Sequence, residues 1–318
     1  MTEYKPLRLY PCYKEYLWGG TRLKKEFGKT DAPDVTAESW ELAELEAGCS
    51  LTGNGESLSQ LASQDREKFW GSSIREDQFP VLVKMIDAAK DLSIQVHPSD
   101  ETAIARLGEQ GKAEMWYIVD CRPGAFLYYG FSKKIRREEF IRRAKDGTIC
   151  DVLNRVPVHP GDVFYILPGT IHAIGAGTLI AEIQQSSNTT FRVYDYGRLD
   201  AHGNPRALHL DRAAEVVDLT PVLPERCRAN NSFETPDFTF SEMFRCRYFS
   251  AYCIQVRREI PLVCDGSSFH HLLCVDGSGE IQAGQTLYPI ERGQSYFLPA
   301  AMGAYRVRGK CRVLLSKR

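Results

Sequence analysis

Two side chains able to hold a metal ion stand two residues apart in the stretch DLSIQVHPSDETA, at positions 91–103. Because side chains alternate between the two faces of a β-strand, Gln95 and His97 point to the same side of this extended stretch. Pro98 then ends the strand. An amide oxygen and an imidazole on one face make this pair a candidate for half of a metal site.

Two further potential ligands follow downstream. Glu114 shares a face with Lys112 in KAEMWYIVD (112–120), and His172 follows a strand and a Pro-Gly turn in GDVFYILPGTIH (161–172). Two neutral imidazoles, one carboxylate and one amide carry a charge of about −1 against +2, so a bound divalent ion keeps positive charge to polarise a substrate oxygen. A structural zinc site would favour thiolates, and the pattern therefore indicates a catalytic metal.

Each of these residues also has a plainer interpretation. His97 alone would be a surface or hydrogen-bonded histidine, and Glu114 alone a solvated edge residue. Lys84 interrupts the apolar strand VLVKMI, where it either reaches outward to solvent or lies buried beside an anion. We favour the buried position, as a contact to substrate or phosphate, and Ser99 after the proline is a second candidate contact. Only the combination of residues indicates a site.

Composition excludes several classes of protein. The 318 residues are 43% hydrophobic and 25% charged, and 40 basic against 41 acidic residues give a net charge of −1. This balance leaves no excess of positive charge that would attract nucleic acid or an anionic membrane. The longest apolar runs are too short to span a bilayer, and the N-terminus lacks the apolar core of a signal peptide, so we expect a cytoplasmic protein. The ten cysteines are scattered without a C-x-x-C pair, which predicts reduced thiols.

The elements that must position these residues are mostly strands. Helical periodicity is confined to the first half, and the chain after LPERCRANN (223–231) is almost purely strand-like. Strands are expected over 80–88, 92–98, 113–120, 125–131, 162–168, 178–185, 191–196, 248–256, 270–277 and 295–300, and helices over 56–70, 99–108 and 133–156. This rhythm predicts a mainly β fold built from barrels or sandwiches rather than βαβ units.

A sequence motif that occurs twice suggests that there are two related barrels. GDVFYILPGTIH (161–172) and GQSYFLPAAMG (293–303) each contain a glycine, an aromatic-rich strand, a proline and a turn of small residues. The first copy has His172 where the second has Gly303. We therefore predict a catalytic domain with added helices over 1–228 and a second, degenerate barrel without a metal site over 229–318.

At this point the motifs resemble a known family. GDVFYILPGTIH resembles the second motif of cupin (jelly-roll) barrels. In order along the chain, IQVHP, GKAEMWY, PGTIHA and FRVYDYGR resemble the signature blocks of type I mannose-6-phosphate isomerases. WGG (18–20), ESWE (38–41) and NPRALH (204–209) fit the same family, and the length resembles its short bacterial form.

The resemblance implies two cupin-type barrels and one Zn²⁺ per chain. It implies zinc ligation by Gln95, His97, Glu114 and His172. It further implies that Arg192 lies beside the metal as a catalytic residue, and that Lys84 and Lys112 line the same pocket. The alternative for Arg192 is a surface ion pair with Asp195 or Glu182.

The reaction that the resemblance implies is the reversible conversion of mannose 6-phosphate to fructose 6-phosphate through a metal-stabilised cis-enediol. A proton moves from C2 to C1, and a cation lowers the barrier by taking up charge on oxygen. Lys112 is our candidate for the proton carrier; a metal-bound water or a histidine is the alternative. The other hypotheses are a different metal-dependent cupin enzyme acting on a sugar phosphate and a non-catalytic sugar-binding cupin. The expected partner is a small sugar phosphate, with the protein a monomer or weak homodimer.

Overall fold

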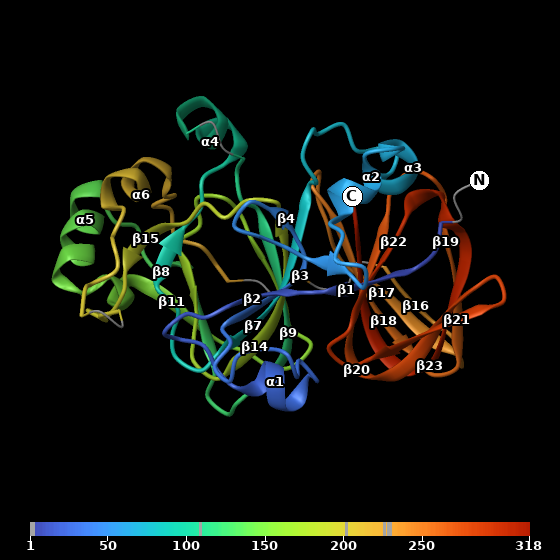
Figure 1. Cartoon of the computed structure of the whole chain (residues 1–318). Helices are drawn as coiled ribbons and strands as arrows, with labels where there is room; N and C mark the ends of the chain where they lie inside the picture. The colour runs from blue at the N-terminus through green and yellow to red at the C-terminus, as the bar shows by residue number, and fades with distance from the viewer. Residues whose placement is uncertain (1–3, 108–109, 201–202, 225–226, 228–230) are drawn as a thin grey trace. The chain divides into compact units, whose positions relative to one another are not determined.

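The computed structural model describes residues 4–107, 110–200, 203–224, 227 and 231–318. The chain forms two compact units (Figure 1). Unit 1 contains residues 1–14, 21–85 and 228–318, and unit 2 contains residues 15–20 and 86–227. Strand β7 (Val81–Ala88) carries the chain from unit 1 into unit 2.

Unit 1 combines N-terminal elements with the C-terminal strands. Its elements before β7 are β1 (Leu7–Tyr10), β2 (Cys12–Lys14), α1 (Arg22–Glu26), β3 (Glu38–Leu42), β4 (Glu44–Leu45), β5 (Gly48–Cys49), β6 (Leu51–Thr52), α2 (Leu58–Ala62) and α3 (Arg66–Trp70). Those after residue 231 are β16 (Ser232–Glu234), β17 (Phe238–Arg245), β18 (Ser250–Val256), β19 (Glu259–Cys264), β20 (His270–Ala283), β21 (Thr286–Glu291), β22 (Ser295–Leu298), the 3₁₀-helix η2 (Ala300–Met302) and β23 (Gly303–Lys317).

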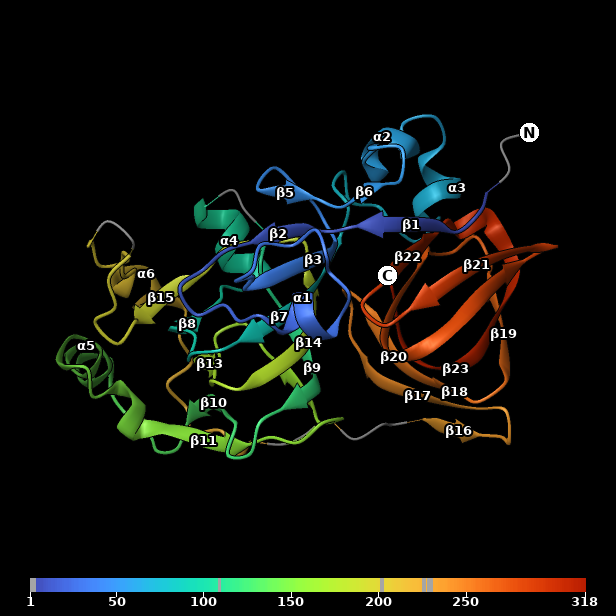
Figure 2. The same cartoon turned by 60° about the horizontal axis from the view of Figure 1, so that its bottom comes forward.

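The sheet of unit 1 has the order β16-β17-β18-β23-β20-β22-β1-β6, with β19 on β23 and β21 on β20. It curls into a barrel, drawn in orange and red in Figure 2. Alternate residues of β23 are buried, and their apolar side chains pack inside with those of β18 and β20. Because β1 pairs with β22, the N-terminal strand is part of this sheet.

The described residues of unit 2 form helices and the strands of two sheets. Its elements are β8 (Ile94–Val96), α4 (Asp100–Leu107), β9 (Glu114–Cys121), β10 (Phe126–Phe131), α5 (Arg137–Asp146), the 3₁₀-helix η1 (Ile149–Val152), β11 (Leu153–Pro157), β12 (Val163–Ile166), β13 (His172–Ile174), β14 (Thr178–Gln185), β15 (Phe191–Tyr194) and α6 (Leu210–Val216). One sheet has the order β11-β10-β13-β8-β15, and the other contains β12-β9-β14.

The inner faces of the two sheets meet in unit 2. The ring of Trp116 on β9 lies 5.3 Å from that of His172 on β13, edge to face. Helices α5 and α6 lie side by side next to β15 (Figure 1) and bury Phe140 and Ala213 in the same core cluster as Val193. These helices are the added segments, and they support the strand that carries Arg192.

The prediction of a mainly β fold is confirmed, and each predicted strand range contains a strand. Two helix predictions are wrong in extent. The range 56–70 forms two short helices, because Asp65 caps the start of α3 by accepting a hydrogen bond from the Lys68 amide. The range 133–156 contains only α5, which ends where Gly147 adopts a left-handed conformation (φ 71°), followed by η1 and β11.

The predicted boundary at 228 coincides with the start of the last segment of unit 1. Residues 21–85, however, belong to the same unit as residues after 228, and backbone hydrogen bonds join the two segments, such as those from the Phe269 amide to the Trp70 carbonyl at 2.7 Å and from the Ser72 amide to the Gly266 carbonyl at 2.9 Å. All ten cysteines are free thiols, three of them buried and the others half-buried. Within the described ranges, no helix combines the length and apolar character needed to cross a membrane.

Candidate metal centre and active site

Three of the predicted site residues lie in one row across a sheet. In the order β13-β8-β15, His172 pairs with Gln95, and Gln95 pairs with Arg192 on its other side. Directly opposite residues in antiparallel strands project to the same face, with Cβ atoms about 5 Å apart. The register therefore places Arg192 next to Gln95 and two strands from His172.

The backbone orients both histidines. His97 Nδ1 lies 2.9 Å from the carbonyl oxygen of Thr189, and His172 Nδ1 lies 2.8 Å from that of Thr170. A carbonyl only accepts, so each Nδ1 carries a proton and donates, which leaves the lone pair on Nε2. Burial lowers the pKa of His172 to about 3, so its ring is neutral, as a metal ligand must be.

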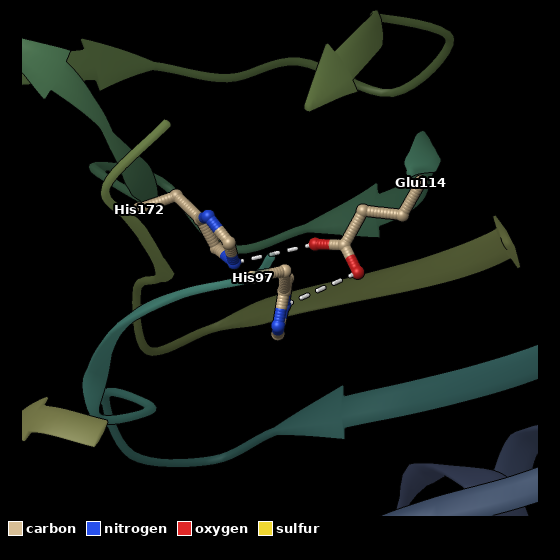
Figure 3. A group of neighbouring side chains, drawn as sticks. All are labelled: His97, Glu114 and His172. Atoms are coloured by element: carbon tan, nitrogen blue, oxygen red, sulfur yellow. Dashed lines mark ion pairs between the residues drawn. The ribbon is translucent and has the colours of Figure 1, made fainter. Parts of the chain in front are cut away.

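The carboxylate of Glu114 faces both of these nitrogens (Figure 3). Its Oε1 is 3.3 Å from His172 Nε2 and its Oε2 is 3.5 Å from His97 Nε2. Donor atoms of the three residues lie within 4.8 Å of one another, and all three side chains are buried. Among the described residues, Oε1 is a buried oxygen without a hydrogen-bond partner. Chiefly through burial, the pKa of Glu114 rises to about 8, which shows how poorly the protein alone stabilises this carboxylate.

These features fit a divalent cation. Two lone pairs and an unpartnered carboxylate oxygen converge on one point, and a positive charge there would offset the burial of the carboxylate. The Gln95 amide also faces this point, with Nε2 3.4 Å from His172 Nε2. Because the oxygen and nitrogen of an amide are assigned from their hydrogen bonds, the alternative orientation presents Oε1 to the same point.

Lys112 contacts this group directly. Its ammonium is ion-paired with Glu114 Oε2, lies 3.1 Å from His97 Nε2 and lies 3.9 Å from Glu182 Oε1. The side chain is buried. The predicted proximity of Lys112 to the candidate ligands is therefore present in the structure.

A side-chain network fixes the segment that carries Lys112. The Asp100 Oδ1 accepts from the Gly111 amide at 3.0 Å and from Gln185 Nε2 at 2.9 Å. Gln185 Oε1 in turn accepts from the Ala113 amide at 2.9 Å. Both backbone neighbours of Lys112 are thereby held to the rest of unit 2.

Arg192 makes neither of the ion pairs weighed as alternatives. Its Nη1 donates to the Ala207 carbonyl at 2.9 Å, and its Nε is buried without a partner among the described residues. The carboxylate of Asp195 instead pairs with Arg198 and Arg206. Burial and the adjacent Arg206 lower the pKa of Arg192. This guanidinium therefore retains donor capacity for an anion.

The two candidate substrate contacts lie in different units. Ser99 stands at the start of α4, where its Oγ accepts from the Thr102 amide at 3.4 Å. Lys84 belongs to unit 1 and is buried, as favoured from the sequence. Its ammonium is 3.4 Å from Glu38 Oε2 and lies over the Trp40 ring.

Sequence reasoning did not assign two buried residues of β14 to the centre, although it named Glu182 as a possible partner of Arg192. Glu182 approaches Lys112 and accepts from the Trp116 indole at 2.9 Å. Gln184 pairs directly with Glu114, and its Oε1 is buried without a partner in the described part of the chain. The signal available was that TLIAEIQQ places both residues on one face of an otherwise apolar strand.

Comparisons with known proteins match this arrangement. Residues 7–120 match the family model of the phosphomannose isomerase type I catalytic domain, and residues 237–318 match that of the mannose-6-phosphate isomerase cupin domain. The chain is 38% identical over 317 residues to the Bacillus subtilis protein named mannose-6-phosphate isomerase ManA, covering 98% of each. It is 33% identical over 322 residues to a Streptococcus mutans mannose-6-phosphate isomerase, again covering 98% of each.

Solved structures agree with the sequence comparisons. A crystal structure of the mannose 6-phosphate isomerase from Bacillus subtilis matches with a TM-score of 0.91 and 34% identity, covering 98% of this chain and 99% of the other. The cupin-type fold expected from the motifs is confirmed by this match and by the cupin-domain model. The chain belongs to the type I phosphomannose isomerase family.

Proposed function

We propose that this protein is an enzyme that interconverts mannose 6-phosphate and fructose 6-phosphate, at a centre that binds one Zn²⁺ per chain. The observation that carries the proposal is the convergence of His97 Nε2, His172 Nε2 and the unpartnered Oε1 of Glu114, within a full-length family match. Gln95 is the proposed fourth ligand. When bound, the ion supplies positive charge for an oxygen of the substrate.

In the proposed reaction, the C2–H bond of the aldose breaks and a C1–H bond forms in the ketose, through a cis-enediol. We propose that the buried Lys112, as a free amine, takes the C2 proton at Nζ, becomes an ammonium and delivers that proton to C1, while the O2 proton passes to O1. The histidines are less suited to this role, because each Nδ1 proton is engaged by a backbone carbonyl.

Arg192 is proposed to stabilise the developing oxyanion. In the row from His172 through Gln95 to Arg192, Arg192 lies next to the proposed ligand Gln95 and two strands from the proposed ligand His172. The buried Nε of Arg192 has no partner among the described residues. A guanidinium directed at developing negative charge lowers the barrier most when it is already in place. Ser99 and Lys84 are proposed as contacts to the substrate, with its phosphate as the group that they recognise.

A coupled assay of mannose 6-phosphate conversion tests this proposal. We expect turnover by the purified protein, loss of turnover after dialysis against a chelator, and its return when zinc is added. Glucose 6-phosphate, the C2 epimer, serves as the control substrate for the placement of C2. Full activity in protein shown by metal analysis to be metal-free would contradict the mechanism.

The enzyme is proposed to act in the cytoplasm, where sugar phosphates are retained, as a monomer or weak homodimer. Analytical ultracentrifugation at several protein concentrations tests the second point. A tight higher oligomer would contradict it.

A further inference from the structure

The barrel of unit 1 contains a cavity that the proposed reaction does not use. Its volume is about 580 Å³, and strands β17, β18, β19 and β23 contribute to its lining. Ligand pockets for small molecules are about 300–1,000 Å³ and combine apolar walls with a few polar groups. Here Phe240 and Tyr252 form part of the wall, with ring centroids 5.1 Å apart.

A buried histidine supplies a polar group to this cavity. His270 is only 6% exposed, and its Nδ1 lies 2.8 Å from the hydroxyl of Tyr305. Burial lowers the pKa of His270 to about 4, so the ring is neutral. Its Nε2 makes no hydrogen bond with any residue that the structure describes, although His270 lines the cavity. Because His270 lines the cavity, this ring nitrogen can exchange a hydrogen bond with a ligand hydroxyl or with water.

Charges of both signs surround the cavity. Glu242 and Arg245 form an ion pair at 2.6 Å, and Arg245 also donates to the Tyr252 hydroxyl at 2.9 Å. The Lys317 ammonium lies 6.0 Å from the Tyr252 ring centroid. Asp265 adds a second carboxylate. The lining thus offers two cations and two anions, with no excess of either.

The cavity lies next to the second copy of the repeated sequence motif. Gly303, which stands where the first copy has His172, pairs with Cys264 between the lining residues Val263 and Asp265. Tyr305 lies two residues further along β23 and so shares the face of Gly303. The second barrel therefore lacks the metal-ligand side chain at this point but retains an inward polar pair, His270 and Tyr305.

We propose that this cavity is a second, non-catalytic binding site for an uncharged sugar. Hydroxyl groups both donate and accept, so they satisfy the carboxylates, the cations and the neutral imidazole at once. A ligand of a single charge would meet like charge on the lining. The rings of Phe240 and Tyr252 offer apolar faces for the C–H side of a sugar ring. The proposal does not depend on the catalytic centre, because every lining residue belongs to unit 1.

Saturation-transfer NMR on the full-length protein tests the proposal, with D-mannose, D-glucose and mannobiose as probes. We expect saturable binding of at least one of them. Lys317→Met and Asp265→Asn should each weaken it about tenfold, the effect of losing one charged hydrogen bond. Lys310→Met, an exposed lysine on the same strand, is the matched control and should leave the dissociation constant unchanged.

The outcomes separate this site from the catalytic centre. The His97→Ala variant should still bind the sugar. Sugar binding that is lost in His97→Ala but kept in Lys317→Met would overturn the proposal. Absence of saturable binding by all three sugars would also overturn it. If inorganic phosphate displaced the sugar competitively, the ligand class would be wrong. Asp265 is exposed, so Asp265→Asn decides the question if Lys317→Met fails to fold.

Discussion

At the scale of single residues, the centre is defined by which atoms of its three side chains face one another. His97 and His172 have their Nδ1 atoms engaged, and their Nε2 lone pairs point at Glu114. Oε1 of Glu114 has no hydrogen-bond partner among the described residues. The residue types and their period-two spacing predicted this group. The tautomer of each histidine depends on the carbonyls of Thr189 and Thr170, which no pattern in the sequence specifies.

Glu114→Gln should remove most of the bound metal. The amide is a neutral ligand, so the set of four proposed ligands loses its one negative charge. Metal content measured after dialysis should fall well below one zinc per chain. Glu182→Gln is the matched control, since Glu182 is also buried near Lys112 but is not a proposed ligand, and it should retain zinc. Stoichiometric zinc in Glu114→Gln would refute the ligand assignment.

Arg192→Ala should lower kcat about 100-fold or more while zinc content stays at one per chain, because a preorganised donor to the oxyanion is lost. Arg192→Lys should recover only part of this loss, since an ammonium cannot present two forked donors. Steady-state kinetics and metal analysis on the same preparations check both results. If zinc were lost together with activity, Arg192 would be a structural residue.

At the scale of elements, strand register assembles the site. Gln95 pairs with both His172 and Arg192, so residues up to 97 positions apart in the sequence become neighbours in the sheet. Alternation in the sequence predicted the strands, but not their order or register. The prediction of one helix over 133–156 is wrong from Gly147 onward, because the left-handed conformation of Gly147 ends α5. Similarly, Lys84 was correctly favoured as buried, yet its contact with Glu38 depends on long-range packing.

Gln185→Leu should lower kcat without removing zinc. The substitution breaks the hydrogen bonds to the Ala113 amide and to Asp100, which hold the segment carrying Lys112. We expect a stability loss of about 1–3 kcal/mol, from the buried amide left unpaired. Activity is measured well below the melting temperature, with zinc quantified.

The control for this prediction is Gln255→Leu in unit 1, which loses a side-chain hydrogen bond to the Cys311 carbonyl far from the centre in sequence. We expect this variant to keep its kcat. Equal loss of kcat in both variants would show that the effect of Gln185→Leu is a general consequence of destabilisation rather than of a displaced Lys112.

At the scale of the whole molecule, the proposed ligands all belong to unit 2, while unit 1 carries the second barrel. The two-barrel organisation was predictable because the motif GDVFYILPGTIH recurs in altered form. That residues 21–85 join the C-terminal strands was not predictable, because this grouping involves hydrogen bonds between segments far apart in sequence, such as that from the Phe269 amide to the Trp70 carbonyl.

Metal removal should therefore loosen one unit selectively. A ligand that binds only the folded state adds about 4 kcal/mol at a concentration 1,000 times its dissociation constant, and this stabilisation disappears with the ion. Hydrogen exchange followed by mass spectrometry should show faster exchange in β8, β9 and β13 after chelation. Strands β18, β20 and β23 should be unchanged. Equal acceleration in both sets would contradict the assignment of the metal to unit 2.

The most direct test of the central claim is a titration of metal-free protein with zinc while mannose 6-phosphate turnover is recorded. We predict that activity rises linearly from near zero and stops rising at one zinc per chain. Activity that is already full before zinc is added, or that stays absent after one equivalent has bound, would contradict the account.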